Sequence, residues 1–197
     1  MINTVIWDYG GVISVTRRSK LFSAWAEKVF GIEKEKIQVL FDDPICDDYS
    51  RGDITTEQFY QRFLKIGIDM DPKAMAVQFA SYNKPDPLMD QILKALFELY
   101  PMYLISDSTP ELTEDVESRM GHYFQEMFFS DKYRTRKDEG LFLTSFLKIP
   151  GIYDEWLYID DREDKLVYPR QQGVTCIHFQ SPEQCQQEIE QILQIKI

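Results

Sequence analysis

Long apolar runs are missing from this chain of 197 residues. Its longest apolar runs hold only a few residues, far below the roughly 18 that a membrane-spanning helix needs. Met1 leads directly into the first predicted strand, without a basic leader or a cleavage site. We therefore expect a cytoplasmic protein that has no membrane partner.

Cysteine, histidine and positive charge are also scarce. Cys46, Cys176 and Cys185 are unevenly spaced and form no Cys-x-x-Cys pair, which argues against a disulfide framework and a structural zinc site. The only histidines, His122 and His178, lie outside the candidate sites described below, so a Ser/His/Asp triad has little support. The chain has 22 Lys and Arg against 33 Asp and Glu, a net charge of −11, which disfavours nucleic-acid partners. An anionic substrate would need a local basic pocket.

Short apolar runs alternate with helical patterns along most of the chain. The runs 4–7, 102–106, 156–160 and 174–179 are typical of buried strands, and 88–99 has apolar residues at a period near 3.6. This alternation predicts an α/β fold, a doubly wound, Rossmann-like parallel sheet with helices on both faces.

Residues 15–84 differ from the rest because no convincing strand appears among them. Helices are expected at 18–30, 33–41, 55–66 and 72–82, and the prolines within 84–87 indicate a linker. The sequence therefore predicts an α/β core domain formed by 1–14 and 85–197. An all-helical cap, residues 15–84, is inserted after the first strand.

Polar side chains recur where the predicted strands end. Asp8 ends the first run and precedes two glycines, Ser106 ends the second run, and Asp160 and Asp161 end the third. Lys137 closes a short basic segment between them. Open α/β sheets place their chemistry at this edge. Taken singly, however, Asp8 could belong to a turn, Ser106 could cap a helix, and the basic segment that ends at Lys137 could be a solvated surface. Two adjacent aspartates repel each other unless a cation or a proton intervenes, so they favour a cation site.

The ordered set of these four sites resembles the haloacid dehalogenase (HAD) superfamily over essentially the full chain. In the phosphatase branch of that family, the resemblance makes Asp8 the nucleophile, with Ser106 and Lys137 holding the phosphoryl oxygens. The acidic pair would bind Mg²⁺, and the inserted helices would form a cap over the site. Residues 49–59 resemble the helical cap of this branch. Within it, the chain looks most like sugar-phosphate phosphatases and the N-terminal domain of epoxide hydrolases.

The residue types suit this chemistry. A carboxylate nucleophile divides phosphoryl transfer into two easier steps, and Mg²⁺ prefers oxygen ligands. We expect Asp160 to orient a water molecule or the lysine beside the ion. The expected metal site consists of Asp8, the Gly10 carbonyl, Asp160 and Asp161. The catalytic residues expected are Asp8, Ser106 and Lys137, and the substrate-binding residues are Gly10, Gly11, Ser106, Asp107, Arg134 and Lys137.

Several positions depart from the family pattern. Gly10 replaces the aspartate that usually protonates the leaving oxygen, a role worth ~10²–10⁴ in rate. The leaving group must therefore be stable as an anion, as in an acyl phosphate or a sugar 1-phosphate, or a water must relay the proton. Arg134 replaces a glycine, and Asp107 and Lys165 each replace a frequent asparagine. Pro169 predicts that the helix after the acidic pair begins late, around residue 166.

The function expected from the sequence is a Mg²⁺-dependent phosphatase of a small phosphorylated metabolite, working through an aspartyl phosphate. Two alternatives stay open. A dehalogenase uses the same nucleophile without an acid, but it does not require Mg²⁺ and leaves Asp160 and Asp161 unexplained. A catalytically degenerate protein would bind a ligand with little or no turnover. The sequence names neither the substrate nor the oligomeric state.

Overall fold

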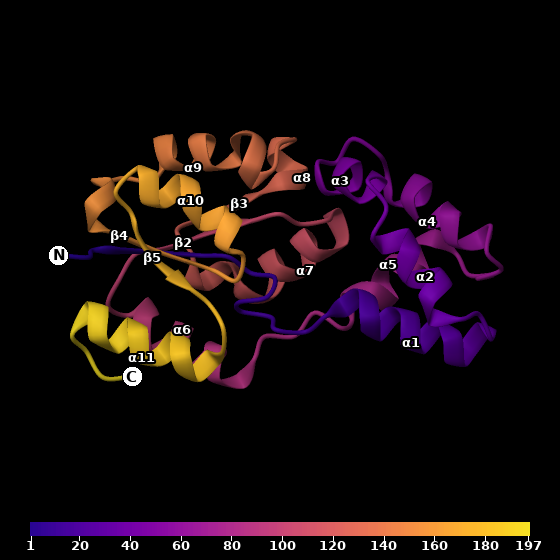
Figure 1. The fold of residues 1–197 in the computed structure, drawn as a ribbon, viewed down its shortest axis with the longest axis horizontal. Coiled ribbons are helices and arrows are strands. Elements are labelled where there is room, and N and C mark those ends of the chain that lie inside the picture. The colour runs from indigo at the N-terminus through magenta and orange to yellow at the C-terminus, as the bar shows by residue number, and fades with distance from the viewer.

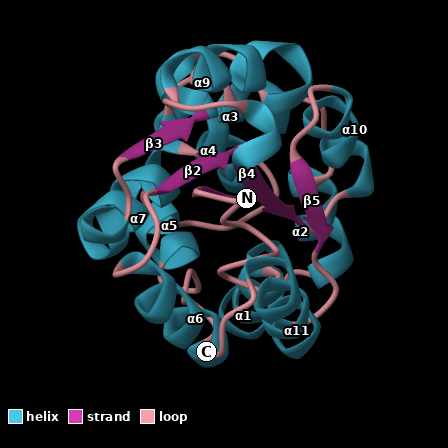
Figure 2. Cartoon of the chain, turned by 90° about the vertical axis from the view of Figure 1, so that its left-hand side faces the viewer, coloured by secondary structure: helices cyan, strands magenta, loops and turns pink.

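A computed structural model describes all residues, 1–197, and contains a five-stranded sheet. The strands are β1 (Thr4–Trp7), β2 (Met102–Ser106), β3 (Glu126–Phe129), β4 (Trp156–Asp160) and β5 (Thr175–His178). They run parallel in the order β3-β2-β1-β4-β5. Helices cover both faces of this sheet (Figure 2). The predicted Rossmann-like α/β fold is confirmed.

The central strands are apolar because both of their faces are buried. Trp7 of β1 packs into a core with α6 (Pro87–Phe97), α7 (Pro110–Met120) and α11 (Pro182–Leu193). Ile6, the residue before it, points to a second core with α9 (Phe142–Lys148) and α10 (Glu163–Gln171). Successive side chains of a strand alternate between faces, so one short strand contributes to both cores.

The segment between β1 and α6 is entirely helical and lies beyond one end of the sheet (Figure 1). It contains α1 (Arg18–Phe30), α2 (Lys34–Phe41), α3 (Ile45–Ser50), α4 (Thr56–Leu64) and α5 (Pro72–Ala80). We call residues 15–84 the helical segment. Thr55 starts α4 with a capping box that includes Gln58, and Asp71 caps α5. Aromatic side chains, among them Phe22, Tyr60 and Phe63, fill a core that lies within the segment except for Leu112, which the α7 helix contributes.

Several elements differ from the sequence-based expectation. The strand β3 and the helix α3 were not predicted, because each is only four to six residues long and carries no clear periodicity. The helix α10 begins at Glu163, so the late start at residue 166 was wrong. Pro169 lies inside α10, where its ring costs one backbone hydrogen bond, and the helix ends two residues later.

The remaining short helix, α8 (Ser130–Tyr133), follows β3 and contacts α3 of the helical segment (Figure 1). None of the helices has both the length and the apolar character that crossing a membrane requires.

Candidate active site

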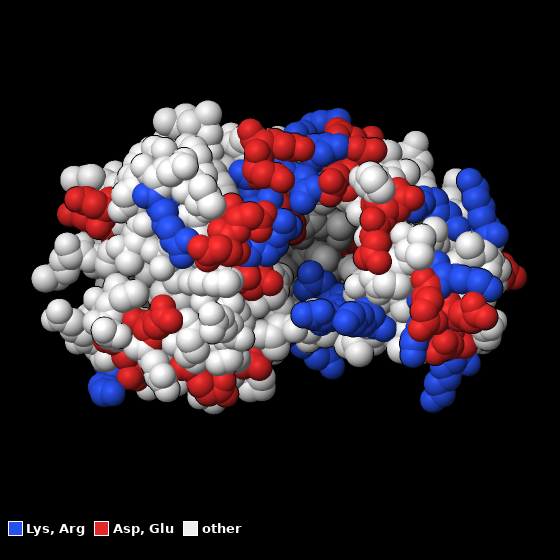
Figure 3. Space-filling model, in the orientation of Figure 1, with Lys and Arg blue, Asp and Glu red and all other residues white.

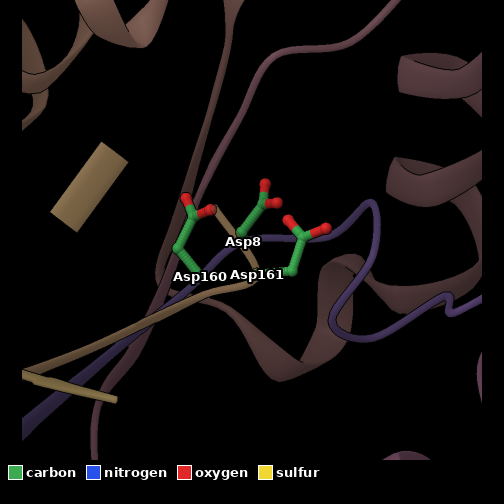
Figure 4. Close-up of side chains that lie close together, drawn as sticks. All are labelled: Asp8, Asp160 and Asp161. Atoms are coloured by element: carbon green, nitrogen blue, oxygen red, sulfur yellow. The ribbon is translucent and has the colours of Figure 1, made fainter. Parts of the chain in front are cut away.

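The carboxyl ends of β1 and β4 bring three aspartates together. Trp7 pairs with Ile159 across the two strands, so the residues that follow them, Asp8 and Asp160, lie side by side. Asp161 comes directly after β4. The three carboxylates point to the same side of the sheet edge (Figure 4), and one oxygen from each lies within 4.8 Å of the others.

A buried lysine joins two of these carboxylates. Lys137 Nζ lies 2.8 Å from Asp8 Oδ1 and 2.7 Å from Asp160 Oδ2, and the three side chains are at most 8% exposed. Burial by itself lowers the pKa of Lys137, but the Asp160 and Asp8 carboxylates outweigh it and raise that pKa above its usual value. The lysine therefore stays charged and holds both carboxylates in place.

Asp8 is poised between its protonated and ionised forms. Burial raises the pKa of Asp8 to about 7, Lys137 opposes this rise, and the neighbouring Asp160 adds to it. Burial also raises the pKa of Asp161, again with a contribution from Asp160. One buried lysine does not balance three carboxylates, so a further cation would be stabilised here.

The donor set suits Mg²⁺. All three side chains offer carboxylate oxygen, the ligand type that this ion prefers. The glycine turn leaves room beside them, because a Cβ on Gly11, which has φ +90°, would lie 2.3 Å from Asp161 Oδ2. Asp160 is the most constrained of the three, since it accepts hydrogen bonds from Lys137, from the Tyr158 hydroxyl and, at 2.9 Å, from a backbone N–H.

Asp107 is neutralised by cations, although it replaces a neutral residue in the family pattern. Its Oδ1 accepts a hydrogen bond of 2.9 Å from the Lys137 backbone N–H. Its Oδ2 lies 3.6 Å from Arg136 Nε and 3.8 Å from Lys165 Nζ. Lys165 is buried and also lies 3.1 Å from Asp138. The charges of Asp107 and Lys165, which both replace an asparagine of the family pattern, thus compensate each other. Asp107 also fixes the backbone that carries Lys137.

A cavity of about 210 Å³ surrounds this cluster and is rich in positive charge. Besides Asp8, Gly10, Asp107, Asp160 and Asp161, its walls contain Arg18, Arg136, Lys137, Arg162 and Lys165. Cationic residues thus outnumber the carboxylates in this cavity of an acidic chain, which favours an anionic ligand. Sequence reasoning missed Arg18, Arg136 and Arg162. Adjacency to Lys137 and to the acidic pair could have indicated the last two, whereas nothing in the sequence pointed to Arg18.

Three predicted binding residues, Gly11, Ser106 and Arg134, do not line this cavity. Ser106 ends β2 and is buried, but it does not line the cavity around Asp8. Arg134 has a left-handed backbone (φ 53°) and a side chain that is 65% exposed. Its Nη2 lies 2.6 Å from Asp53 Oδ1 of the helical segment, so in this structure Arg134 pairs with that segment and does not line the cavity. The backbone turn at Arg134 directs this side chain away from the cluster.

Ion pairs connect the helical segment to the loop that carries Lys137. Arg51 Nη1 lies 2.9 Å from Glu139 Oε1, and Arg136 pairs with Asp47. Together with the pair made by Arg134, these contacts hold residues 47–53 against the lysine loop. The helical segment therefore borders the cavity instead of extending freely from the sheet.

No protein-family model and no curated sequence matches the chain. Solved structures do match it in fold. A HAD-like family hydrolase from Porphyromonas gingivalis aligns over 100% of both chains with a TM-score of 0.81 and 18% identity. A HAD family enzyme from Bacteroides thetaiotaomicron, a mutant in complex with magnesium and inorganic phosphate, covers 91% of this chain and 95% of its own, with a TM-score of 0.76 and 18% identity.

An L-2-haloacid dehalogenase from Xanthobacter autotrophicus, with chloropropionic acid covalently bound, is more distant. It covers 97% of this chain and 83% of its own, with a TM-score of 0.62 and 17% identity. Phosphate-binding and dehalogenating proteins both occur among these structures, so the shared architecture does not separate the two chemistries. The chain has the fold of the HAD-like hydrolases.

Proposed function

We propose that this protein is a Mg²⁺-dependent phosphatase of a small phosphorylated metabolite, working through an aspartyl phosphate on Asp8. The observation that carries the proposal is the buried contact of Lys137 with both Asp8 and Asp160, next to Asp161. This arrangement offers a nucleophile, a fixed positive charge and a set of oxygen donors in one cavity.

Asp8, the Gly10 carbonyl and Asp161 would hold Mg²⁺, and Asp160 would orient Lys137 beside them. The ion supplies positive charge that offsets the negative charge of a phosphoryl group. Lys137 favours the ionised form of Asp8, which is the form that attacks phosphorus. The residues 15–84 would act as a cap over the cavity, since residues 47–53 are paired with the lysine loop.

The test is Mg²⁺-dependent release of inorganic phosphate from a panel of phosphorylated metabolites. We expect Asp8→Asn to abolish release, because an amide is not a nucleophile for this reaction. The matched control is Asp90→Asn, which alters an aspartate on the outer surface of α6, paired only with Lys94. Release that persists in Asp8→Asn, or that continues with the metal chelated, would overturn the proposal.

A second candidate is dehalogenation, which the absence of a carboxylate at position 10 favours because halide leaves without a proton. The same preparations should then be offered 2-haloacids in the presence of a chelator. Halide release under those conditions, with no phosphate release under any, would favour this candidate. Binding of Mg²⁺ and phosphate without either product would indicate a degenerate binding protein.

A further inference from the structure

Arg18 fills the space that a side chain at position 10 would enter. It begins α1, in the helical segment, and its guanidinium reaches back toward the turn after β1. A Cβ placed on Gly10 would lie 3.2 Å from Arg18 Nη2. Position 10 is where the family pattern has an acid that protonates the leaving oxygen. The structure therefore has a permanent cation where an acid is expected.

The guanidinium is held on one side and free on the side of the cavity. Arg18 Nη1 donates a hydrogen bond of 2.9 Å to Asn83 Oδ1, and Asn83 is in turn buried and bonded to Asp115 at 2.8 Å. No carboxylate oxygen lies within 4.0 Å of the Arg18 nitrogens. Burial lowers the pKa of Arg18, while Tyr9 and Asp8 oppose that effect, and an arginine keeps its proton in proteins. An unpaired, oriented charge thus faces the cavity.

Arg18 also lies where two cavities meet. It lines the cavity of about 210 Å³ around Asp8 and a larger one of about 480 Å³ between the helical segment and the core. A hollow between these two parts is visible in Figure 3, with Lys and Arg side chains beside it. A phosphoryl group held at Asp8 would direct the rest of its substrate past Arg18 into the larger cavity.

We propose that Arg18 is a catalytic residue that stabilises the negative charge of the leaving oxygen, in place of an acid. The proposal rests on the phosphatase function. An Asp8 oxygen forms a bond to phosphorus, the bond from phosphorus to the ester oxygen breaks, and its electron pair stays on that oxygen. Arg18 transfers no proton, and the oxygen takes one from water afterwards. Attack of water on the aspartyl phosphate then yields dihydrogen phosphate and restores the Asp8 carboxylate.

This role sets the class of substrate. Charge stabilisation without proton transfer is sufficient only for leaving groups that are comparatively stable as anions, such as the anomeric oxygen of a sugar 1-phosphate. The walls of the larger cavity suit such a ring. They include Phe41, Phe59, Phe79 and Glu111. The Glu111 carboxylate accepts hydrogen bonds from the Tyr49 and Tyr60 hydroxyls at 2.5 Å and 3.0 Å. We infer a sugar 1-phosphate as substrate and not a sugar phosphorylated on a primary hydroxyl.

The test measures kcat/KM for a series of aryl phosphates, from 4-nitrophenyl to phenyl phosphate, with Mg²⁺ present. For Arg18→Met we expect a loss of about 10²–10³ on phenyl phosphate, the cost of removing one donor from a developing oxyanion. On 4-nitrophenyl phosphate, whose leaving 4-nitrophenolate is stable without a cation, we expect kcat/KM to fall by less than about tenfold. The rate therefore depends more steeply on the leaving group in the variant.

Matched variants separate this role from a structural one. Lys28→Met removes a positive charge from the other end of α1, and it should leave the dependence of kcat/KM on the leaving group unchanged. Arg18→Lys keeps the charge and should lie between the wild type and Arg18→Met, which also keeps the proposal testable should Arg18→Met fail to fold. Thermal unfolding and binding of inorganic phosphate, measured on each variant, report on folding and on ground-state binding.

The outcomes are distinguishable. An equal loss on every ester, or no loss, would overturn the role of Arg18 while leaving the phosphatase function in place. A wild type that prefers a sugar 6-phosphate over the 1-phosphate would overturn the substrate class. A wild type that releases phosphate from no ester would overturn the phosphatase function and this inference with it.

Discussion

Replacing Lys137 by methionine would test the electrostatic account of the site. The substitution keeps the length and apolar stem of the side chain but removes the charge that Asp8 and Asp160 share. Removing one partner of a buried ion pair costs ~3–5 kcal/mol. In a domain of this size each kcal/mol lowers the Tm by ~2–4 °C, so we expect a fall of about 6–20 °C near pH 8.

The loss of stability in Lys137→Met should depend on pH because Asp8 titrates near neutrality. Burial raises the pKa of Asp8 to about 7 even with Lys137 opposing the rise, and without the lysine it would be higher. A carboxyl whose pKa is raised in the folded state contributes stability at low pH and loses it as pH rises through that pKa. Below this range Asp8 is neutral and Lys137 has only Asp160 to balance. Lys137→Met should therefore lie closer to wild type at about pH 5.5 than at about pH 8.

Lys165→Met is the matched control. Lys165 is as buried as Lys137, with 3% exposure, but its nearer partner, Asp138, is 56% exposed and can be solvated when unpaired. Unfolding in urea should be followed for both variants at the two pH values, with a chelator and then with Mg²⁺. Added Mg²⁺ should stabilise Lys137→Met more than wild type, since a second cation can replace the lost one. A cost below ~1 kcal/mol at about pH 8, or a pH dependence equal to that of Lys165→Met, would refute the reasoning.

Three further variants test other parts of the account. Gly11→Ala should destabilise the fold by about 1–3 kcal/mol and weaken Mg²⁺ affinity, because φ is +90° and the new Cβ would displace Asp161. Calorimetric Mg²⁺ titration checks this prediction, and unchanged affinity would contradict it. Arg134→Ala should leave kcat/KM and phosphate binding within about twofold of wild type, because the only charged partner of Arg134 is the solvent-exposed Asp53. A large fall in kcat/KM or in phosphate affinity would show that Arg134 contributes to substrate binding. Burial raises the pKa of Glu111, with Tyr49 opposing it, so wild-type stability should fall as pH rises above the usual glutamate value. Glu111→Gln should flatten that part of a urea-midpoint profile, and identical profiles would argue against a raised pKa of Glu111.

The fold was predictable where burial leaves a local mark. β1, β2 and β4 are buried on both faces, so they stand out as uninterrupted apolar runs. Capping residues marked the starts of α4 and α5. At the sheet edge, β3 has two half-buried residues, Glu126 and Met127, and its four positions carry no readable alternation. Tertiary pairing with β2, and not local preference, makes this segment a strand.

The candidate site was predictable only in the part that strand ends determine. The parallel sheet brings Asp8, Asp160 and Asp161 to one edge whatever the loops do, and Lys137 was found through its place in an ordered set. Whether a neighbouring arginine enters the cavity wall depends on backbone turns that the sequence does not reveal. Within one short loop the left-handed turn at Arg134 sends its side chain outward, while Arg136 lines the cavity.

Arg18 is the clearest example of a residue that sequence reasoning could not assign. It lies only ten positions after Asp8, but its direction depends on how the helical segment leaves β1 and on the contact with Asn83. Neither is encoded in a local pattern. The same holds for Asp107 and Lys165, which looked like separate departures until the fold placed them 3.8 Å apart.

The most direct measurement is a search for phosphate covalently attached to Asp8. Wild-type protein would be mixed with Mg²⁺ and a phosphorylated substrate, quenched in acid within one turnover, digested and examined by mass spectrometry. We predict a phosphoryl group on the peptide that contains Asp8, absent without Mg²⁺ and absent in Asp8→Asn. Phosphate release without any modified Asp8, or at the wild-type rate in Asp8→Asn, would contradict the central claim.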